Sequence, residues 1–221
     1  MIITVDGPAG SGKSTVSRIV ARRLGLTYLN SGFIYRAITL LVVEDGGDFE
    51  NKERVAELIA SMDLRFVENE DHTRVLLGER DVTQRLKDPD ITPQIFRIAN
   101  DGHLRSLLLG IQRSFGAPPG VVAEGRDMGT VIFPEADYKF YLDATPEERA
   151  RRQQMELEVK GHSKSFADVL SEVLERDRHD RERAFAPLRV PQGAIHVRTD
   201  NLSIKDVVEM ILKRVQSAEV S

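Results

Sequence analysis

The sequence near the N-terminus contains a G-x-x-x-x-G-K-S run, Gly7-Pro8-Ala9-Gly10-Ser11-Gly12-Lys13-Ser14. It follows the apolar segment Ile2-Ile3-Thr4-Val5 and precedes apolar residues at helical spacing. In this context the run is typical of a phosphate-binding loop, because its glycines let backbone N–H groups surround an anion and the next helix adds its dipole. Lys13 would supply a positive charge, and Ser14 a hydroxyl for Mg²⁺. The predicted phosphate site comprises Gly7, Pro8, Ala9, Gly10, Ser11, Gly12, Lys13, Ser14 and Thr15.

Helices and strands are expected to alternate after this loop. A helix over about 13–24 ends before Gly25, a strand follows over 26–29, and Asn30-Ser31-Gly32 begins a second helix. Strand, loop and helix in repeated succession indicate an α/β fold with a parallel sheet flanked by helices. The 221 residues fit one domain with small inserts.

The middle of the chain has a different pattern. Short strands are predicted over 64–67, 74–77 and 81–83, separated by the polar segments Glu68 to Thr73 and Gly78-Glu79-Arg80. We interpret them as a small antiparallel insert, which Pro89 and Pro93 close. A helix through Ile98 and a longer one over about 101–115 follow. The predicted division is a single domain, 1–221, with a core over about 1–45, 98–145 and 177–221, an insert over about 46–97 and a helical lid over about 146–176.

Charged residues follow the apolar strand predicted over 121–123. Glu124, Arg126 and Asp127 stand where the end of a parallel strand faces the ligand crevice of an open α/β sheet. Glu124 is a candidate for supporting Mg²⁺ through water, and Arg126 and Asp127 for meeting a substrate. The alternative is an ordinary polar loop.

Two later helices carry patterned charge. The helix that begins at Pro146 has Arg149, Arg151 and Arg152, which fit either a lid over phosphates or a solvated face paired with nearby acids. The next helix has an apolar stripe at Phe166, Val169 and Val173. The predicted stripe continues as charged residues, so it either borders a polar cleft that holds an anion or is an exposed helix end. These charged residues are Arg176, Asp180 and Arg183.

Composition excludes several classes of protein. With 31 basic and 35 acidic residues the net charge is −4, so no overall positive field favours nucleic acid or an acidic membrane. No apolar run approaches the length of a membrane span and no leader pattern is present, so we expect a cytoplasmic protein. The absence of cysteine excludes disulfides and thiolate zinc sites, and the five histidines lack metal-ligand spacing.

Five arginines from separate elements narrow the choice among phosphate-loop proteins: Arg36, Arg105, Arg126, Arg176 and Arg183. Converging guanidinium groups suit a second phosphate group beside the bound nucleotide. The Asn-Lys-x-Asp and Asp-x-x-Gly runs of GTPase switches are missing from the sequence. A kinase for another small molecule, such as shikimate or dephosphorylated coenzyme A, and a non-catalytic nucleotide-binding module remain alternatives.

Over nearly its whole length the chain resembles the bacterial-type cytidylate kinases, of the nucleoside monophosphate kinase group. The resemblance rests on Asp6 to Ser14, on Asn30-Ser31-Gly32 with Tyr35-Arg36, and on Gly125-Arg126-Asp127-Met128-Gly129-Thr130. The run Arg176 to Arg181 with Arg183-Ala184 and Ala186-Pro187-Leu188 completes it. The insert is similar to the extension that distinguishes this family from its relatives. Asn30 departs from the family, where an acidic residue is expected in many members.

The resemblance implies that ATP, with Mg²⁺, donates its γ-phosphate to CMP or dCMP and yields ADP with CDP or dCDP. It implies cytosine contacts from Ser31, Arg126 and Asp127 and a sugar contact from Asp180. Tyr35, Arg36 and Arg105 would belong to the acceptor pocket, Arg176 and Arg183 would face the sugar and phosphate, and Arg152 would be the lid arginine. The implied catalytic residues are Lys13, Arg126 and Arg152. A monomer whose partners are small nucleotides is expected.

The assignment to cytosine also has a chemical reason. Cytosine presents an N4 amine donor beside the N3 and O2 acceptors, so the Asp127 carboxylate would accept from the amine. Arg126 and Ser31 would donate to the acceptors. Uracil reverses the hydrogen-bonding polarity at its position 4, so an acidic partner favours cytosine.

Overall fold

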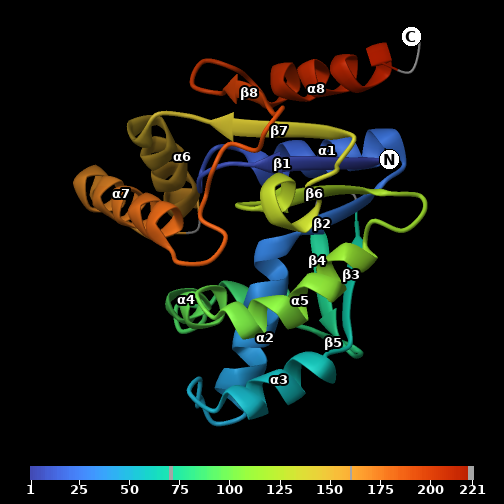
Figure 1. Cartoon of the computed structure of the whole chain (residues 1–221). Coiled ribbons are helices and arrows are strands. Elements are labelled where there is room, and N and C mark those ends of the chain that lie inside the picture. The colour runs from blue at the N-terminus through green and yellow to red at the C-terminus, as the bar shows by residue number, and fades with distance from the viewer. Residues whose placement is uncertain (70–71, 160, 219–221) are drawn as a thin grey trace. The chain divides into compact units, whose positions relative to one another are not determined.

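The computed structural model describes residues 1–69, 72–159 and 161–218. The chain forms two compact units, one comprising Met1–Tyr28 and Gly116–Ser221 and the other Leu29–Phe115 (Figure 1). Within the described ranges, no helix combines the length and hydrophobicity needed to cross a bilayer.

A five-stranded sheet forms the centre of the first unit, with the strand order β2-β6-β1-β7-β8. β1 pairs in parallel with β6 and β7, and β7 pairs in parallel with β8. Asp6, the last residue of β1, is opposite Gly125 of β6 and Tyr141 of β7. The loops that follow these strands therefore leave the sheet at the same edge. The strands are β1 (Ile2–Asp6), β2 (Thr27–Asn30), β6 (Val121–Gly125), β7 (Tyr138–Asp143) and β8 (Ile195–Arg198).

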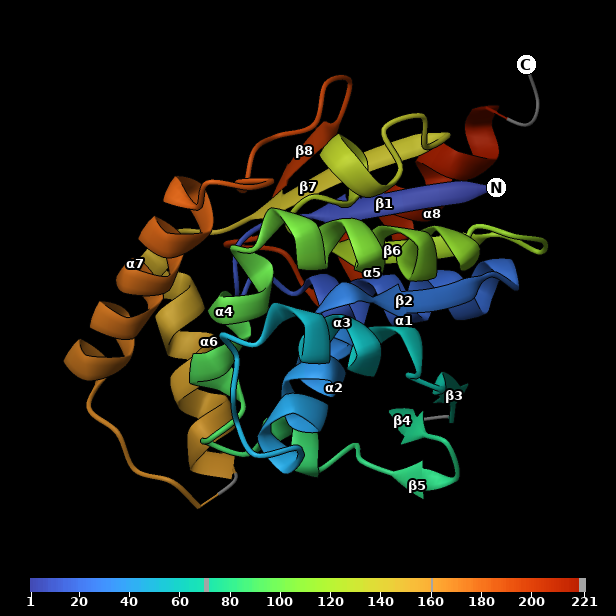
Figure 2. The same ribbon diagram turned by 60° about the horizontal axis from the view of Figure 1, so that its bottom comes forward.

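Helices of the first unit cover the sheet and extend from its edge. α1 (Lys13–Leu24) and α8 (Ile204–Ala218) share one apolar core with β1, β6 and β7. Apolar burial of this kind is the main stabilising term of such a layer. α6 (Pro146–Val159) and α7 (Phe166–Glu182) lie side by side in both ribbon views and share a small core of their own (Figures 1 and 2). A π-helical turn, Met128–Ile132, follows β6.

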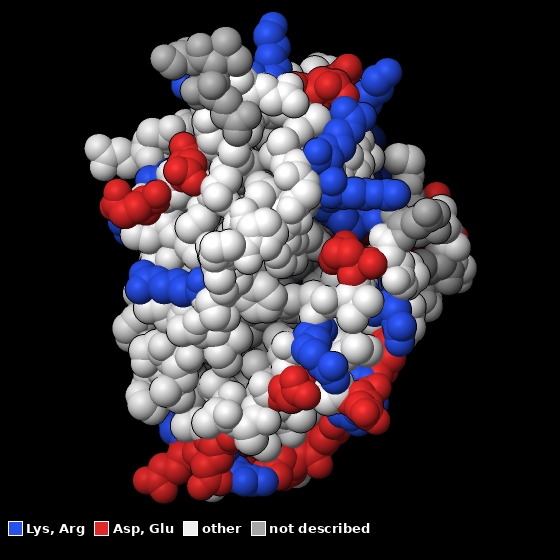
Figure 3. Space-filling view, turned by 90° about the vertical axis from the view of Figure 1, so that its right-hand side faces the viewer, with Lys and Arg blue, Asp and Glu red and all other residues white. Residues whose placement is uncertain are grey.

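The second unit combines helices with a small antiparallel sheet of order β3-β4-β5. Its core joins Ala37 and Leu40 of α2 to Val75 of β4 and to Leu86 and Ile91. Exposed acids lie on and around α3. Acidic side chains also gather along the lower edge of the space-filling view in Figure 3. The elements are α2 (Ser31–Glu44), α3 (Lys52–Ala60), β3 (Leu64–Glu68), β4 (Thr73–Leu77), β5 (Arg80–Asp81), α4 (Ile95–Ala99) and α5 (Gly102–Ser114), with 3₁₀ turns at Arg85–Lys87 and Thr92–Gln94.

The predicted fold class is confirmed, and the antiparallel insert forms where it was expected. Two local predictions are wrong. The strand predicted over 26–29 begins at Thr27, because the N–H of Leu26 still closes the end of α1 on Ala21. The strand predicted over 81–83 ends at Asp81, whose carboxylate accepts hydrogen bonds from the N–H and hydroxyl of Thr83. The second helix begins at the predicted place, with Asn30 at the N-cap position of α2, although the Asn30 side chain makes no capping hydrogen bond.

The predicted division into core, insert and lid follows different boundaries from the two compact units. α2 and α5 were assigned to the core by sequence but belong to the second unit. The division concerns parts that would move during a reaction cycle, so it stays a prediction. The polar segment expected from Glu68 to Thr73 includes residues 70 and 71, and the expected lid includes residue 160; these three lie outside the described residues.

Candidate active site

The predicted phosphate site is a loop between β1 and α1. Its first glycine is required: Gly7 has φ +147°, and a Cβ atom there would lie 2.0 Å from the carbonyl oxygen of Leu142. Gly12, at φ 90°, is the N-cap of α1 in a left-handed conformation that other residues rarely adopt. The loop therefore holds the shape that lets backbone N–H groups and the α1 N-terminus face an anion.

Lys13 is buried at the first position of α1. Its Nζ donates to the carbonyl oxygen of Pro8 at 2.6 Å and to Ser11 Oγ at 3.5 Å. Burial lowers the pKa of Lys13 to about 7, and the charge of Arg126 acts in the same direction, against Glu124 and Asp180. A bound phosphate would restore the charged form, because an adjacent anion favours a protonated lysine.

A cavity of about 990 Å³ opens beside the loop within the first unit. Lys13, Arg152, Arg176, Thr199 and Asp200 are among its lining residues. The Arg152 guanidinium donates to Glu148, at 3.0 Å, and to the hydroxyl and carbonyl oxygens of Thr199, at 3.1 and 2.6 Å. The structure thus brings together three of the predicted cationic residues around a space large enough for a nucleotide.

Ser14 and Glu124, the predicted metal-site residues, are in contact. Ser14 Oγ donates to Glu124 Oε1 at 2.6 Å, and the hydroxyl of Tyr28 donates to the same oxygen at 3.2 Å. Hydroxyl and carboxylate oxygens are the hard ligands that Mg²⁺ takes. Among the described residues, no group of three or more His, Asp or Glu side chains forms a metal site. The donor set therefore fits an ion that obtains most of its ligands from water and nucleotide phosphates.

The residues predicted after β6 meet residues of α7 and of the segment that follows it. Arg126 Nε donates to Asp180 Oδ2 at 2.5 Å, and Arg183 Nη2 lies 3.6 Å from Asp127 Oδ1. Burial disfavours the charge of Arg126, but Asp180 outweighs it, so the pKa of Arg126 is raised. Burial acts likewise against the Asp180 charge, but Arg126 holds the pKa of that carboxyl below its usual range. These four side chains form one charged cluster, which we call the Arg126 cluster.

The remaining predicted acceptor residues belong to the second unit. Ser31 is buried at the first position of α2. The guanidinium carbon of Arg105, on α5, lies 5.5 Å from the ring centroid of Tyr35, on α2. Arg36 donates to the carbonyl oxygen of Leu86 at 2.9 Å and to Thr92 Oγ1 at 2.7 Å. Tyr35 and Arg105 are thus brought together, whereas Arg36 is directed to the 3₁₀ turns.

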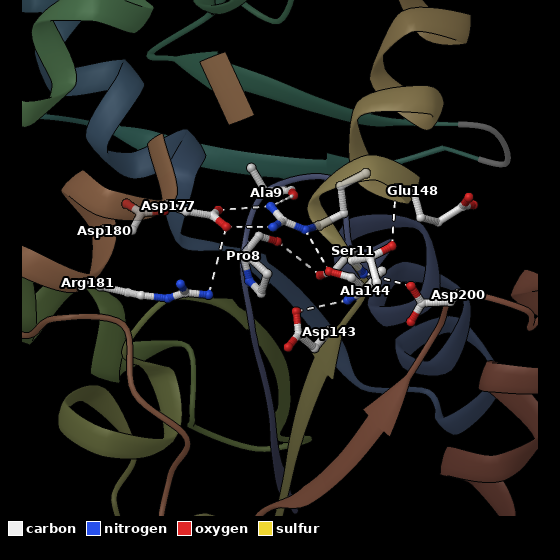
Figure 4. A network of polar contacts seen from close by, with 12 residues as sticks. Pro8, Ala9, Ser11, Asp143, Ala144, Glu148, Asp177, Asp180, Arg181 and Asp200 are labelled. Atoms are coloured by element: carbon white, nitrogen blue, oxygen red, sulfur yellow. Dashed lines mark hydrogen bonds and ion pairs between the residues drawn. The ribbon is translucent and has the colours of Figure 1, made fainter. Parts of the chain in front are cut away.

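Sequence reasoning missed a buried ion pair, Arg149 with Asp177. Nη1 and Nη2 of Arg149 donate to the two oxygens of Asp177 at 2.9 and 2.5 Å. Nη1 also donates to the carbonyl oxygen of Ala9, and Nε donates to that of Ala144. Figure 4 shows Asp177 near Ala9, with Arg181 on its other side. Arg149 is 1% exposed, so neither a lid role nor a solvated face describes it. It joins α6 and α7 to the phosphate loop.

The stripe predicted on α7 keeps its apolar part, since Val169 and Val173 are buried. Arg176, with which the stripe was predicted to leave the core beside a polar cleft, is exposed and lines the cavity. The prediction did not include Asp177, the next buried residue of this helix. Strict i+4 spacing from Val173 would have selected Asp177. A buried acid in that place requires a buried basic partner, so the same pattern could have pointed to Arg149.

Comparison with known proteins gives consistent matches. The sequence model of the cytidylate kinase family matches residues 3–217. The cytidylate kinase of Carboxydothermus hydrogenoformans is 41% identical over 213 residues, which cover 96% of this chain and 96% of the relative. That of Methylococcus capsulatus is 44% identical over 217 residues, covering 98% and 97%. Among solved structures, a shikimate kinase from Bacteroides thetaiotaomicron is similar in fold alone, with a TM-score of 0.52, 12% identity and 98% of each chain covered.

Proposed function

The chain belongs to the cytidylate kinase family, and we propose that it transfers the γ-phosphate of ATP to CMP or dCMP through the phosphate loop and the Arg126 cluster. One observation carries this proposal. The register of β1 with β6 brings the phosphate loop and the Arg126 cluster out of the sheet at the same edge. A donor phosphate and an acceptor nucleotide need such neighbouring sites.

The donor site would be Gly7 to Thr15 with the adjoining cavity. Its backbone N–H groups and Lys13 would hold the ATP phosphates. Ser14, with Glu124 behind it, would hold Mg²⁺, which supplies neutralisation of phosphate charge when it is bound. Arg152 and Arg176 line the same cavity, so they would face the donor phosphates from α6 and α7.

The acceptor base and sugar would contact the Arg126 cluster. The Asp127 carboxylate would accept from the cytosine N4 amine, Arg126 would donate to a ring acceptor, and the Asp180 carboxylate would accept from a sugar hydroxyl. Arg183 lies 3.6 Å from Asp127 and would hold that carboxylate in place. In the second unit, Ser31, Tyr35, Arg36 and Arg105 would take part in acceptor binding, with the two arginines on its phosphate.

The transfer step needs positioning and charge stabilisation. The second pKa of a nucleoside monophosphate is near ~6, so the acceptor oxygen is already largely deprotonated at neutral pH and no general base is needed. That oxygen attacks the γ-phosphorus, and the bond from the γ-phosphorus to the bridging oxygen of the β-phosphate breaks, which leaves ADP. Lys13, Arg126 and Arg152 would stabilise charge on the moving phosphoryl group.

The lid and insert are part of the proposal. α6 and α7 share the buried residues Ala150, Val169 and Val173, which supports movement of residues 146–176 as one body. The insert over about 46–97 would close on the acceptor. Closure of both would exclude water, which competes as an acceptor for the phosphoryl group. A monomer suffices for this mechanism, since every residue it uses belongs to one chain.

The test is steady-state phosphate transfer from Mg·ATP to CMP, dCMP, UMP, AMP, GMP and shikimate. Transfer mainly to CMP and dCMP is expected. Lys13→Met should lower kcat by at least about 100-fold, because it removes a charge that acts on the transferring group. Lys213→Met removes an exposed lysine of α8 and should leave kcat unchanged. Transfer to shikimate without transfer to CMP would refute the proposal, and binding of ATP without any transfer would favour a non-catalytic module.

A further inference from the structure

Asp6 is a buried carboxylate that the proposed mechanism does not use. It is the last residue of β1, it is 0% exposed, and it directly precedes the phosphate loop. Its Oδ1 accepts the backbone N–H of Met128 at 2.7 Å, and its Oδ2 accepts the N–H of Gly129 at 2.8 Å. Both oxygens of one side chain are thus bonded to consecutive amides of the turn that follows Asp127.

The same turn is packed closely against β1. A Cβ atom on Gly129 would lie 2.8 Å from Thr4 Oγ1 and 2.9 Å from Pro191 Cγ, closer than real Cβ contacts. The turn can therefore approach the strand only because residue 129 is glycine. Asp6 and Gly129 together fix the main chain of Met128 and Gly129 to β1 by polar contact and by shape.

Holding the Met128 amide also restricts the main chain of Asp127, because one planar peptide unit joins the two residues. The Asp127 carboxylate is 3% exposed and lies near Arg183, inside the Arg126 cluster. Asp6 is at the same time covalently joined to Gly7, the first residue of the phosphate loop. One buried side chain therefore links the start of the donor loop to the main chain that presents the residue reading the base.

We propose that Asp6 is a positioning residue for the acceptor nucleotide: through the amides of Met128 and Gly129 it holds Asp127 in the orientation that accepts from the cytosine amine. This inference rests on the proposed function. It assigns to Asp6 a role in acceptor affinity and in the choice of cytosine over uracil, and no contact with ATP, because both of its carboxylate oxygens are bonded to the amides of the turn.

The chemistry of the site explains why a carboxylate is needed. Two parallel N–H donors require two acceptors, and among side chains of this length only aspartate offers both. Asparagine would offer one acceptor and turn its NH₂ group toward the other N–H. Burial raises the pKa of Asp6 to about 7, while the N–H groups of Gly129 and Met128 favour its charged form. The amide donors thus compensate part of the cost of a buried charge.

The experiment compares Asp6→Asn with the unmodified protein. We expect KM for CMP to rise by about tenfold, and the preference for CMP over UMP in kcat/KM to fall by a similar factor, because one of two buried hydrogen bonds is lost. The Kd of a non-hydrolysable ATP analogue should stay within about twofold. Equal weakening of acceptor and donor binding, or weakening of neither, would overturn the proposal.

Two further variants separate positioning from general damage. Gly129→Ala forces the turn away from β1 while Asp6 is intact, so it should reproduce the rise in KM for CMP without a change in ATP affinity. If Asp6→Asn does not fold, Gly129→Ala alone tests whether the position of the turn controls CMP binding. Ser17→Ala, on α1, is the control for a buried polar substitution outside this turn, because the Ser17 hydroxyl has no hydrogen-bond partner among the described residues. Failure of the unmodified protein to phosphorylate CMP would refute the proposed function itself. That outcome is distinct from a failure of the proposal for Asp6, which is judged by comparing the variants with an active unmodified protein.

Discussion

Lys13 shows at the scale of one residue that the donor site is built for a ligand. Its ammonium group donates to the carbonyl oxygen of Pro8, yet burial and the charge of Arg126 together lower the pKa of Lys13 to about 7. Burying a lysine in this way lowers the free energy of unfolding. Residues with a perturbed pKa are common in functional sites.

The cost of burying Lys13 predicts a pH dependence of stability. The folded-state pKa is about 7 and the reference value 10.5, so between these values the unfolded chain binds more protons and stability from this group rises with pH. Lys13→Met lacks this contribution. The free energy of unfolding of the variant minus that of the unmodified protein should therefore fall as pH rises from about 7 to about 10. Urea unfolding at three pH values across this window measures the difference.

Lys213→Met is the control for that measurement, because the exposed Lys213 of α8 should give no such slope. A difference for Lys13→Met that stays constant over the window would mean that Lys13 titrates as a solvated lysine does. The burial argument would then be wrong.

Individual residues were predictable where they interrupt a pattern. Arg126 and Asp127 stand out because charge follows an apolar strand, and Asp180 and Arg183 because charge continues a helical stripe; the structure groups all four. Asp6 gave no such signal, since a single acid at a strand end is equally compatible with solvent exposure. Its role depends on the amides of Met128 and Gly129, more than 120 residues away in sequence.

At the scale of elements, the Arg149–Asp177 pair determines how α6 and α7 are attached. Arg149 binds the carbonyl oxygens of Ala144 and Ala9 as well as the Asp177 carboxylate. One guanidinium thus connects the start of α6, the phosphate loop and the middle of α7. We expect this pair to stay in place, at the attachment of α6 and α7 to the phosphate loop, when the proposed lid moves.

Breaking this pair should destabilise the protein. Arg149→Met leaves the Asp177 carboxylate buried, with only the more distant Arg181 at 3.8 Å, so we expect a loss of about 3–5 kcal/mol in the free energy of unfolding. Arg151→Met is the matched control on the same helix. The Arg151 side chain is 62% exposed, and its pair with Glu148 should contribute less than about 1 kcal/mol. Urea unfolding of both variants gives the comparison.

The double variant Arg149→Met with Asp177→Leu tests the cause of that loss. If the loss comes from an uncompensated buried charge, replacing the acid by an apolar residue should recover a large part of it. A double variant as unstable as Arg149→Met would instead attribute the loss to the hydrogen bonds of Arg149 with the carbonyl oxygens of Ala9 and Ala144.

Elements were predictable from periodicity, and their ends were not. The apolar spacing of α1 and the glycine after it gave its observed bounds, Lys13–Leu24. β5 ends two residues early because a side chain, Asp81, bonds the Thr83 backbone and turns the chain. A side-chain hydrogen bond of this kind competes with the backbone hydrogen bonds of the strand. The pattern of apolar residues does not predict it, because it depends on the geometry of one polar group.

At the scale of the whole molecule, the net charge does not favour the binding of anions. The net charge is −4, and exposed acids lie on and around α3, although the proposed ligands are anions. Anion binding therefore depends on the cationic residues of the sites themselves rather than on an overall field. Several of these residues already contact carboxylates, as Arg126 does with Asp180 and Arg152 with Glu148. Their charges are thus held in fixed positions before a ligand arrives.

Separate donor and acceptor sites predict separate effects of their ligands on global stability. CMP alone and a non-hydrolysable ATP analogue alone should each raise the free energy of unfolding by about 2.7 kcal/mol at a concentration 100 times the Kd. Asp127→Asn should lose most of the response to CMP and keep the response to the analogue, because the contact proposed for Asp127 is with the acceptor base. Asp63→Asn replaces an exposed carboxylate directly before β3 and should keep both responses. Urea unfolding with and without each ligand measures these shifts, and an Asp127→Asn protein that responds fully to CMP would remove Asp127 from the acceptor site.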